Sequence, residues 1–115
     1  MTGFPYDIRS ASNNNLGHYG DFALRTLGVR RLGSACLDLA YVAAGRLDGY
    51  WEFAVEAWDV AAGMLLVEEA GGLVTRADGR PDPLDPPTSI LAAGARLHAA
   101  MLSVLAEPQE RPAAG

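Results

Sequence analysis

The chain has 115 residues, half of them hydrophobic, and a formal net charge of −5. Its length suits one domain, or part of one, with a core of ordinary size. The largest basic cluster is Arg30-Arg31, no apolar run approaches the roughly 18 residues of a transmembrane helix, and the N-terminus lacks a signal-peptide pattern. We therefore expect no nucleic-acid partner and no membrane partner.

The single cysteine, Cys36, cannot form a disulfide within the chain. This composition is typical of the reducing cytoplasm, which is the expected location. Cys36 lies in an apolar segment without a neighbouring histidine. We expect a buried structural thiol there rather than a nucleophile.

The first part of the chain alternates predicted strands and helices. Thr2–Tyr6 is expected to be the end of a strand, and Val29–Leu32 a short strand. Between them, apolar residues recur at helical spacing from Leu16 to Leu27, with asparagines before them and a glycine after. A second helix is predicted over Ala35–Ala44, where Gly45 ends it.

The second part continues the alternation. Strands are predicted over Tyr50–Phe53, Leu73–Thr75 and Ser89–Ala93. A helix over Trp58–Ala70 is apolar nearly all round, which predicts burial between layers. A closing helix has its apolar face at Leu97, Ala100, Met101, Val104 and Leu105. The succession implies an α/β fold, a mixed sheet with helices layered on it.

The domain is expected to cover residues 1–106, followed by a disordered tail over residues 107–115 that is rich in alanine and proline. The proline-rich segment Pro81–Pro87 is expected to be a surface loop. Because the chain opens inside a predicted strand with no preceding helix to cover it, we expect the second half of a larger unit, although a whole domain could begin in this way.

Asp59 is the most informative residue. It opens the Trp58–Ala70 helix, where an aspartate is a favoured cap and suits the positive end of the helix dipole. Gly63 lies one turn later on the same face, although glycine inside a helix costs about 1 kcal/mol relative to alanine. A hydrated metal ion with an anionic substrate, approaching the backbone beside the carboxylate, would explain that glycine. The cap and the metal-ligand interpretations are compatible.

Two further features point to a site. Gly33-Ser34-Ala35 lies at a strand-to-helix turn, where free backbone amides favour an anion such as phosphate, and Arg30 or Arg31 could add positive charge. Glu52 is a carboxylate in an otherwise aromatic strand and could accept hydrogen bonds from hydroxyl groups. On spacing alone each feature is a weak signal, and a tight turn and a water-facing glutamate are the more common explanations.

Together these segments resemble the inositol monophosphatase family. Arg31–Glu52 resembles the segment that precedes the family's signature, and Trp58–Gly63 with Glu69–Gly72 is similar to its C-terminal signature. Thr2–Tyr6 resembles the strand end that opens the family's second half. The resemblance runs to about Leu105, and it implies the C-terminal half of a layered α/β/α fold with a mixed sheet.

The resemblance also implies roles. Asp59 matches an aspartate that ligates a catalytic Mg²⁺, and Gly33, Ser34 and Ala35 match the turn that lines the substrate pocket. Glu52 matches the carboxylate that hydrogen-bonds hydroxyls of a polyol phosphate. The implied activity is Mg²⁺-dependent hydrolysis of inositol monophosphate or a related phosphate monoester, by a homodimer.

The chain departs from the family in its metal ligands. The family's acidic Glu-Glu segment and Asp-Pro-x-Asp-Gly-Thr loop are absent before residue 33, and Asp82–Asp85 begins like that loop but runs into Pro86-Pro87. His18 and His98 have no partners at metal spacing and are expected to be surface or helix-face residues. The chain could be a fragment, could receive the missing N-terminal half from another chain, or could be an inactive interaction or scaffold module.

Overall fold

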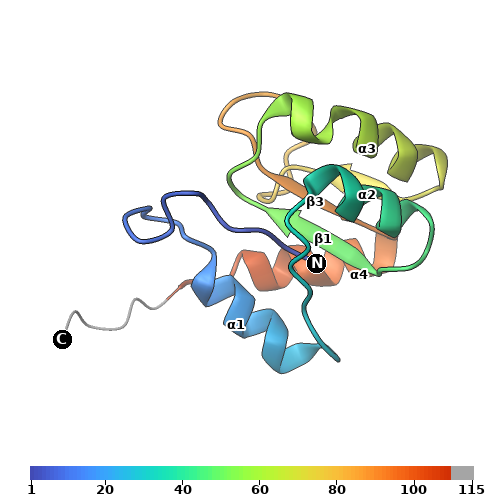
Figure 1. Cartoon of the computed structure of the whole chain (residues 1–115). Helices are drawn as coiled ribbons and strands as arrows, with labels where there is room; N and C mark the ends of the chain where they lie inside the picture. The colour runs from blue at the N-terminus through green and yellow to red at the C-terminus, as the bar shows by residue number, and fades with distance from the viewer. Residues whose placement is uncertain (110–115) are drawn as a thin grey trace.

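The computed structural model describes residues 1–109 (Figure 1). Its elements in chain order are α1 (Leu16–Arg25), α2 (Ala35–Ala43), β1 (Gly49–Glu52), α3 (Ala57–Glu69), β2 (Leu73–Thr75), β3 (Ile90–Ala93) and α4 (Ala95–Leu105). The four predicted helices and the strands at 50–53, 73–75 and 89–93 are therefore confirmed, with bounds that move by a few residues.

The sheet has three strands in the order β1-β3-β2, and both pairings are antiparallel. An isolated parallel bridge joins Thr2 to Trp51 on the outer side of β1, outside the named strands. The sheet of the described residues is therefore antiparallel rather than mixed as expected, because the N-terminal segment does not pair beyond this one bridge. The strand β3 is central, and all four of its residues are buried.

Two predicted strands do not form. Thr2–Tyr6 contributes only the bridge at Thr2, and Val29–Leu32 contributes one backbone bond, from the Thr2 amide to the Arg30 carbonyl at 3.1 Å. Pro5 has no N–H with which to extend pairing along the first segment. These predictions, based on local apolar pattern, were wrong because a strand also needs a partner ladder.

Strand alternation divides the core into two layers. Tyr50, Ile90 and Ala92 face α2 and α3, where they pack with Leu39, Val60 and Val67. Trp51, Leu91 and Ala93 point the other way and pack with Phe22, Met101 and Leu105 of α1 and α4. Successive side chains of a strand point to opposite faces, so this short sheet carries helices on both sides (Figure 1). The layered α/β/α architecture is thus confirmed.

Gly63 serves the packing of α2 against α3. A Cβ added at Gly63 would lie 2.6 Å from both Cβ and Cδ1 of Leu39. The close approach that the sequence indicated is therefore that of a neighbouring helix, and the expectation of a ligand beside Gly63 is wrong.

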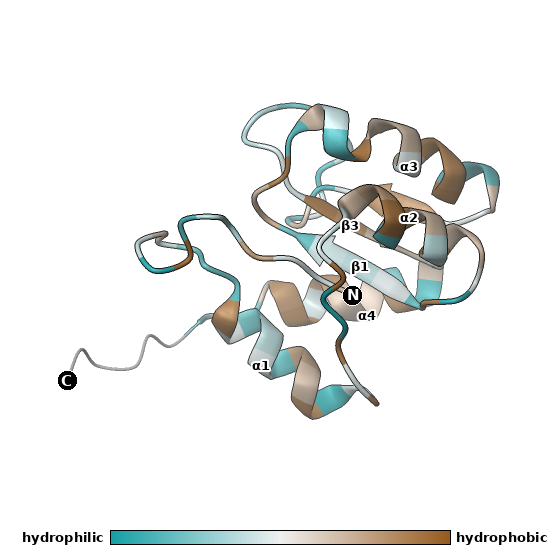
Figure 2. Cartoon of the chain, viewed as in Figure 1, coloured by the Kyte–Doolittle hydropathy of each residue, from teal (hydrophilic) through white to brown (hydrophobic). Residues whose placement is uncertain are grey.

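The outer side of α3 is apolar and exposed. Trp58 is 79% exposed, and Leu65 and Leu66 are 58% and 49% exposed. Figure 2 shows the hydrophobic colour running along this helix. Within residues 1–109, α3 is covered only on the side of Val60, Gly63 and Val67. The expected burial between two layers is therefore found on one face of α3, while the opposite face is exposed in the described residues.

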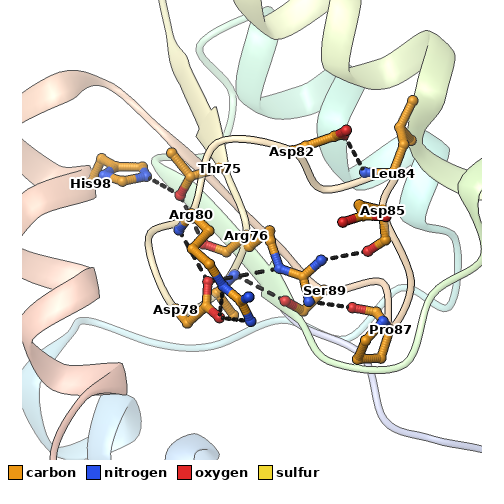
Figure 3. Close-up of polar contacts among 11 residues, drawn as sticks. Thr75, Arg76, Asp78, Arg80, Asp82, Leu84, Asp85, Pro87, Ser89 and His98 are labelled. Carbon is orange, nitrogen blue, oxygen red and sulfur yellow. Dashed lines mark hydrogen bonds and ion pairs between the residues drawn. The ribbon is translucent and has the colours of Figure 1, made fainter.

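Hydrogen bonds from Arg76 hold the loop at 81–87 in place (Figure 3). The guanidinium of Arg76 is buried and donates to the carbonyl of Pro87 at 2.6 Å and to the carbonyl of Asp85. Its backbone amide donates to the Arg80 carbonyl at 2.8 Å. Asp82 and Asp85 are exposed, as a surface loop requires, although Pro83 is fully buried.

Both histidines are buried, contrary to expectation. His98 forms a 2.8 Å hydrogen bond with the Thr75 hydroxyl (Figure 3), and His18 packs on the ring of Phe53 at a centroid distance of 4.8 Å. Burial lowers the pKa of both rings. They are core residues on the inner faces of α1 and α4.

The first residues of the segment predicted to be a disordered tail, 107–109, pack on α1. Arg25 pairs with Glu107 at 3.1 Å, and the Gln109 amide donates to Asp21 at 2.8 Å, so residues 107–109 contact α1. Residues 110–115, the remainder of the expected tail, lie outside the described residues.

Candidate functional site

One cavity of about 450 Å³ brings the predicted site residues together. Its walls come from the turn before α2, the end of β1, the start of α3 and the N-terminal segment. Its lining includes Gly33, Ser34, Ala35, Glu52 and Asp59. Residues that are far apart in sequence therefore share one concave surface.

The turn before α2 forms one wall. Gly33 has φ of 83°, in the left-handed region where glycine is favoured. Ser34 caps α2, because its hydroxyl accepts a 3.2 Å hydrogen bond from the Leu37 amide. The preceding amides of α2 have no carbonyl one turn earlier, so they remain donors, and the positive end of the helix dipole adds to them. This wall can bind an anion.

Asp59 lies in the first turn of α3. The N-cap is Glu56 rather than Asp59, and the Glu56 backbone amide donates to Asp59 Oδ2 at 3.1 Å. Asp59 is exposed and lines the cavity. Its carboxylate therefore stabilises the helix start from the third helical position rather than as the N-cap, and it also lines the cavity. Its role as a metal ligand stays a prediction.

Glu52 is half-buried at the end of β1. The Tyr50 hydroxyl donates to its Oε1 at 2.8 Å. Gly3 lies so close that a Cβ there would be 2.0 Å from Oε1. Burial raises the pKa of Glu52; the bond from Tyr50 works in the opposite direction, and the charge of Asp38 adds to the increase.

Asp38 is a site residue that the sequence reasoning missed. It lines the same cavity from the first turn of α2 but is only 1% exposed, and its Oδ1 has no hydrogen-bond partner in the described part of the chain. Burial raises its pKa to about 6, against the effect of the N-terminal ammonium and Arg31. A lone carboxylate in the otherwise apolar helix 35–43 was the available signal.

The cavity contains Arg31, whereas Arg30 lines a second, mostly apolar cavity of about 600 Å³ between α1 and α4. The Arg31 guanidinium lies 5.9 Å from the centre of the Phe4 ring. Cys36 is exposed and lines the first cavity, so the expected burial of this thiol is wrong. It is the second residue of α2, at the N-terminal end of the helix.

The residues present supply only part of a metal site. Within residues 1–109 there is no group of three or more His, Cys, Asp or Glu side chains that could hold a metal ion. Mg²⁺ requires near-octahedral oxygen coordination and is bound through carboxylates plus water and substrate. Asp59 fits as one ligand of such an ion, and the described residues do not complete the set.

Comparison with known proteins identifies the class to which this fold and cavity belong. The model of the inositol monophosphatase family matches residues 2–110. The inositol-1-monophosphatase of Mesorhizobium japonicum is 52% identical over 99 residues, covering 80% of this chain and 37% of that protein. The Nus factor SuhB of Pseudomonas aeruginosa is 54% identical over 76 residues, covering 64% of this chain and 28% of that protein.

A solved inositol monophosphatase from Anabaena superposes with a TM-score of 0.86 at 47% identity, over 90% of this chain and 41% of that one. The chain therefore belongs to the inositol monophosphatase family, and the resemblance seen in its sequence is confirmed. It spans about two fifths of the length of these relatives.

No helix among the described residues is long and apolar enough to span a membrane.

Proposed function

We propose that this chain supplies the substrate-lining wall and one metal ligand of a Mg²⁺-dependent phosphatase. The substrate is inositol monophosphate or a related polyol or sugar phosphate. The observation that carries the proposal is that Gly33, Ser34, Ala35, Glu52 and Asp59 line one cavity.

Each wall of the cavity suits a different part of such a substrate. The amides at the start of α2 and the guanidinium of Arg31 attract the phosphate oxygens. Glu52, fixed by Tyr50, accepts a hydrogen bond from a hydroxyl group of the polyol. Bound Mg²⁺ would supply charge neutralisation and an activated water, and Asp59 would hold it from the start of α3.

The remaining metal ligands must come from polypeptide outside the described residues. One carboxylate cannot hold Mg²⁺ tightly, because binding depends on several oxygen ligands at once. Activity is thus proposed for an assembly in which this chain is joined, covalently or not, by the part that its longer relatives contain.

The test is Mg²⁺-stimulated phosphate release from inositol, histidinol and nucleotide 3′-phosphates. It is run on the chain alone and on the chain mixed with the preceding segment of the Mesorhizobium japonicum relative. In whichever sample is active, Asp59→Asn should reduce turnover about 100-fold or more, since several kcal/mol of charge stabilisation depends on the ion. Glu68→Gln, an exposed carboxylate on α3 away from the cavity, should leave turnover unchanged. Equal activity of both variants would refute the role of Asp59.

The second candidate is an interaction or scaffold module without turnover. The absence of a three-residue metal group within residues 1–109 favours it, and the Pseudomonas aeruginosa relative is named as a Nus factor. If neither the chain nor the mixture releases phosphate while the two parts still associate, this function replaces the first.

We also propose a homodimer in the cytoplasm. The exposed apolar side chains of α3 favour association, and the lone, exposed thiol of Cys36 suits a reducing compartment. Sedimentation of the assembled protein, and microscopy of the tagged protein in cells, test these two statements separately.

A further inference from the structure

Asn15 has an unusual place in the fold. It precedes α1 with φ of 69°, in the left-handed region that asparagine tolerates better than most residues. Its residue exposure is only 2%, although it lies in a connecting segment. A buried asparagine in this conformation requires partners for its amide.

Those partners lie in the N-terminal segment and in β1 itself. The Asn15 side-chain nitrogen donates to Thr2 Oγ1 at 2.8 Å and to the Gly3 carbonyl at 2.7 Å. The indole N–H of Trp51 donates to Asn15 Oδ1 at 2.7 Å. One amide thus connects the N-terminal segment with a core side chain on the α1 and α4 side of the sheet.

The N-terminal segment has other attachments as well: the Met1 ammonium donates to the Gly49 carbonyl of β1 at 2.9 Å, and the Thr2 amide donates to the Arg30 carbonyl at 3.1 Å. The Thr2 hydroxyl donates to the Trp51 carbonyl at 2.7 Å, and the Trp51 amide donates to the Met1 carbonyl at 3.2 Å. A single bridge, rather than a ladder, joins the two segments. The Gly3 carbonyl accepts a hydrogen bond from Asn15 at 2.7 Å and a longer one from the Thr2 hydroxyl at 3.4 Å, so Asn15 makes the shorter of these two attachments of Gly3.

Gly3 is the residue that meets Glu52. A Cβ at Gly3 would lie 2.0 Å from Glu52 Oε1 and 2.5 Å from its Cδ, so the backbone of Gly3 forms a wall against this carboxylate. Tyr50 holds the same oxygen with a 2.8 Å hydrogen bond. The carboxylate is fixed between a hydroxyl donor and a backbone wall.

We propose that Asn15 is a positioning residue for Glu52. By fixing Thr2 and Gly3, it keeps the wall closed over one side of the carboxylate, so that Glu52 presents a defined acceptor to the cavity. That the acceptor meets a hydroxyl of a polyol phosphate rests on the proposed function. The positioning itself concerns only residues of this chain.

The experiment follows the ionisation of Glu52 by ¹³C NMR of carboxyl-labelled glutamate, with Glu52→Gln to assign the signal. Burial raises the pKa of Glu52, and the charged or titratable groups that influence it are Tyr50, Asp38, Asp59 and Arg31. The variant Asn15→Gly keeps the backbone conformation available and removes the side-chain bonds. The pKa of Glu52 should fall toward that of a solvated glutamate, because water reaches the carboxylate once the wall opens.

Asn13→Ala is the matched control, because Asn13 is an exposed asparagine two residues away, and it should leave the titration unchanged. Thr2→Val, which removes one hydroxyl at almost constant volume, is the milder variant if Asn15→Gly does not fold. It should lower the pKa of Glu52 in the same direction by a smaller amount. A folded Asn15→Gly or Thr2→Val protein with a lower melting temperature but an unchanged Glu52 titration would overturn the proposal, because Asn15 would then be structural only.

The same variants separate this inference from the proposed function. If Asn15→Gly shifts the Glu52 titration while Glu52→Gln does not weaken substrate binding by the assembled protein, positioning stands and the hydroxyl-binding role of Glu52 fails. If both effects appear, the KM for a polyol phosphate should rise more than that for a phosphate monoester without neighbouring hydroxyls.

Discussion

Replacing Asp38 by asparagine should stabilise the protein at neutral pH and remove part of its pH dependence. Burial raises the pKa of Asp38 from 3.8 to about 6 in the folded state. Between these two values the folded chain binds a proton that the unfolded chain has released. Stability from this group is therefore fully present below pH 3.8 and is lost as the pH rises through about 6.

The size of the pKa shift of Asp38 sets the expected change in the free energy of unfolding. A difference of about two pKa units, at 1.36 kcal/mol each, corresponds to a loss of about 3 kcal/mol above pH 6. Asparagine is close in size to aspartate and stays neutral, so Asp38→Asn should recover most of this free energy at pH 7.5. It should recover almost none at pH 4.

The assay is urea unfolding of the wild type and the variant at several pH values from 4 to 8. The buried histidines titrate alike in both proteins, so the difference between the two curves reports Asp38 together with the two groups that its charge influences, Glu52 and the N-terminal ammonium. Asp7→Asn, at an exposed aspartate, should give no difference at any pH. A variant that is no more stable than the wild type at pH 7.5, or a gap that does not change with pH, would refute the reasoning.

Three further outcomes are expected. Gly63→Ala should destabilise the chain by about 1–3 kcal/mol in urea unfolding, because the new methyl group meets Leu39; a more stable variant would mean that helix propensity outweighs the overlap. Arg76→Met should speed proteolytic cleavage within residues 81–87, because two loop carbonyls lose their buried donor; cleavage at the wild-type rate would contradict that anchoring role. The isolated chain should associate with rising concentration or melt over a broad range, because α3 exposes apolar side chains; a monodisperse monomer with a sharp melt in calorimetry and sedimentation argues the opposite.

The helices were predictable because their signals are local. Apolar spacing, the glycine stops and the serine at position 34 define α2 and α4 without knowledge of what they contact. The short central strand β3 was predictable for a similar reason, since its run of apolar residues is bounded by turns. The strands expected at 2–6 and 29–32 failed because pairing depends on distant segments that the local pattern does not reveal.

The site residues were found through the family resemblance more than through physics. The turn at Gly33 and the carboxylates of Glu52 and Asp59 were ambiguous by spacing alone, and their common cavity became visible only in three dimensions. Asp38 was missed because the sequence does not show that its carboxylate is buried at the cavity rather than exposed to water. Cys36 was misjudged because apolar neighbours in the sequence do not show which positions of a helix face the core; Cys36 and the adjacent Leu37 are both exposed.

The two tryptophans of the chain stand in opposite environments. Trp51 is 2% exposed in the core, whereas Trp58 is 79% exposed at the start of α3. The fluorescence emission of an indole moves to shorter wavelength when water is excluded. A layer that covers α3 should therefore shift the emission of Trp58, while that of the buried Trp51 should stay unchanged. The chain thus carries its own optical reporter for any partner that covers α3, readable in dilute solution without a label or a substrate.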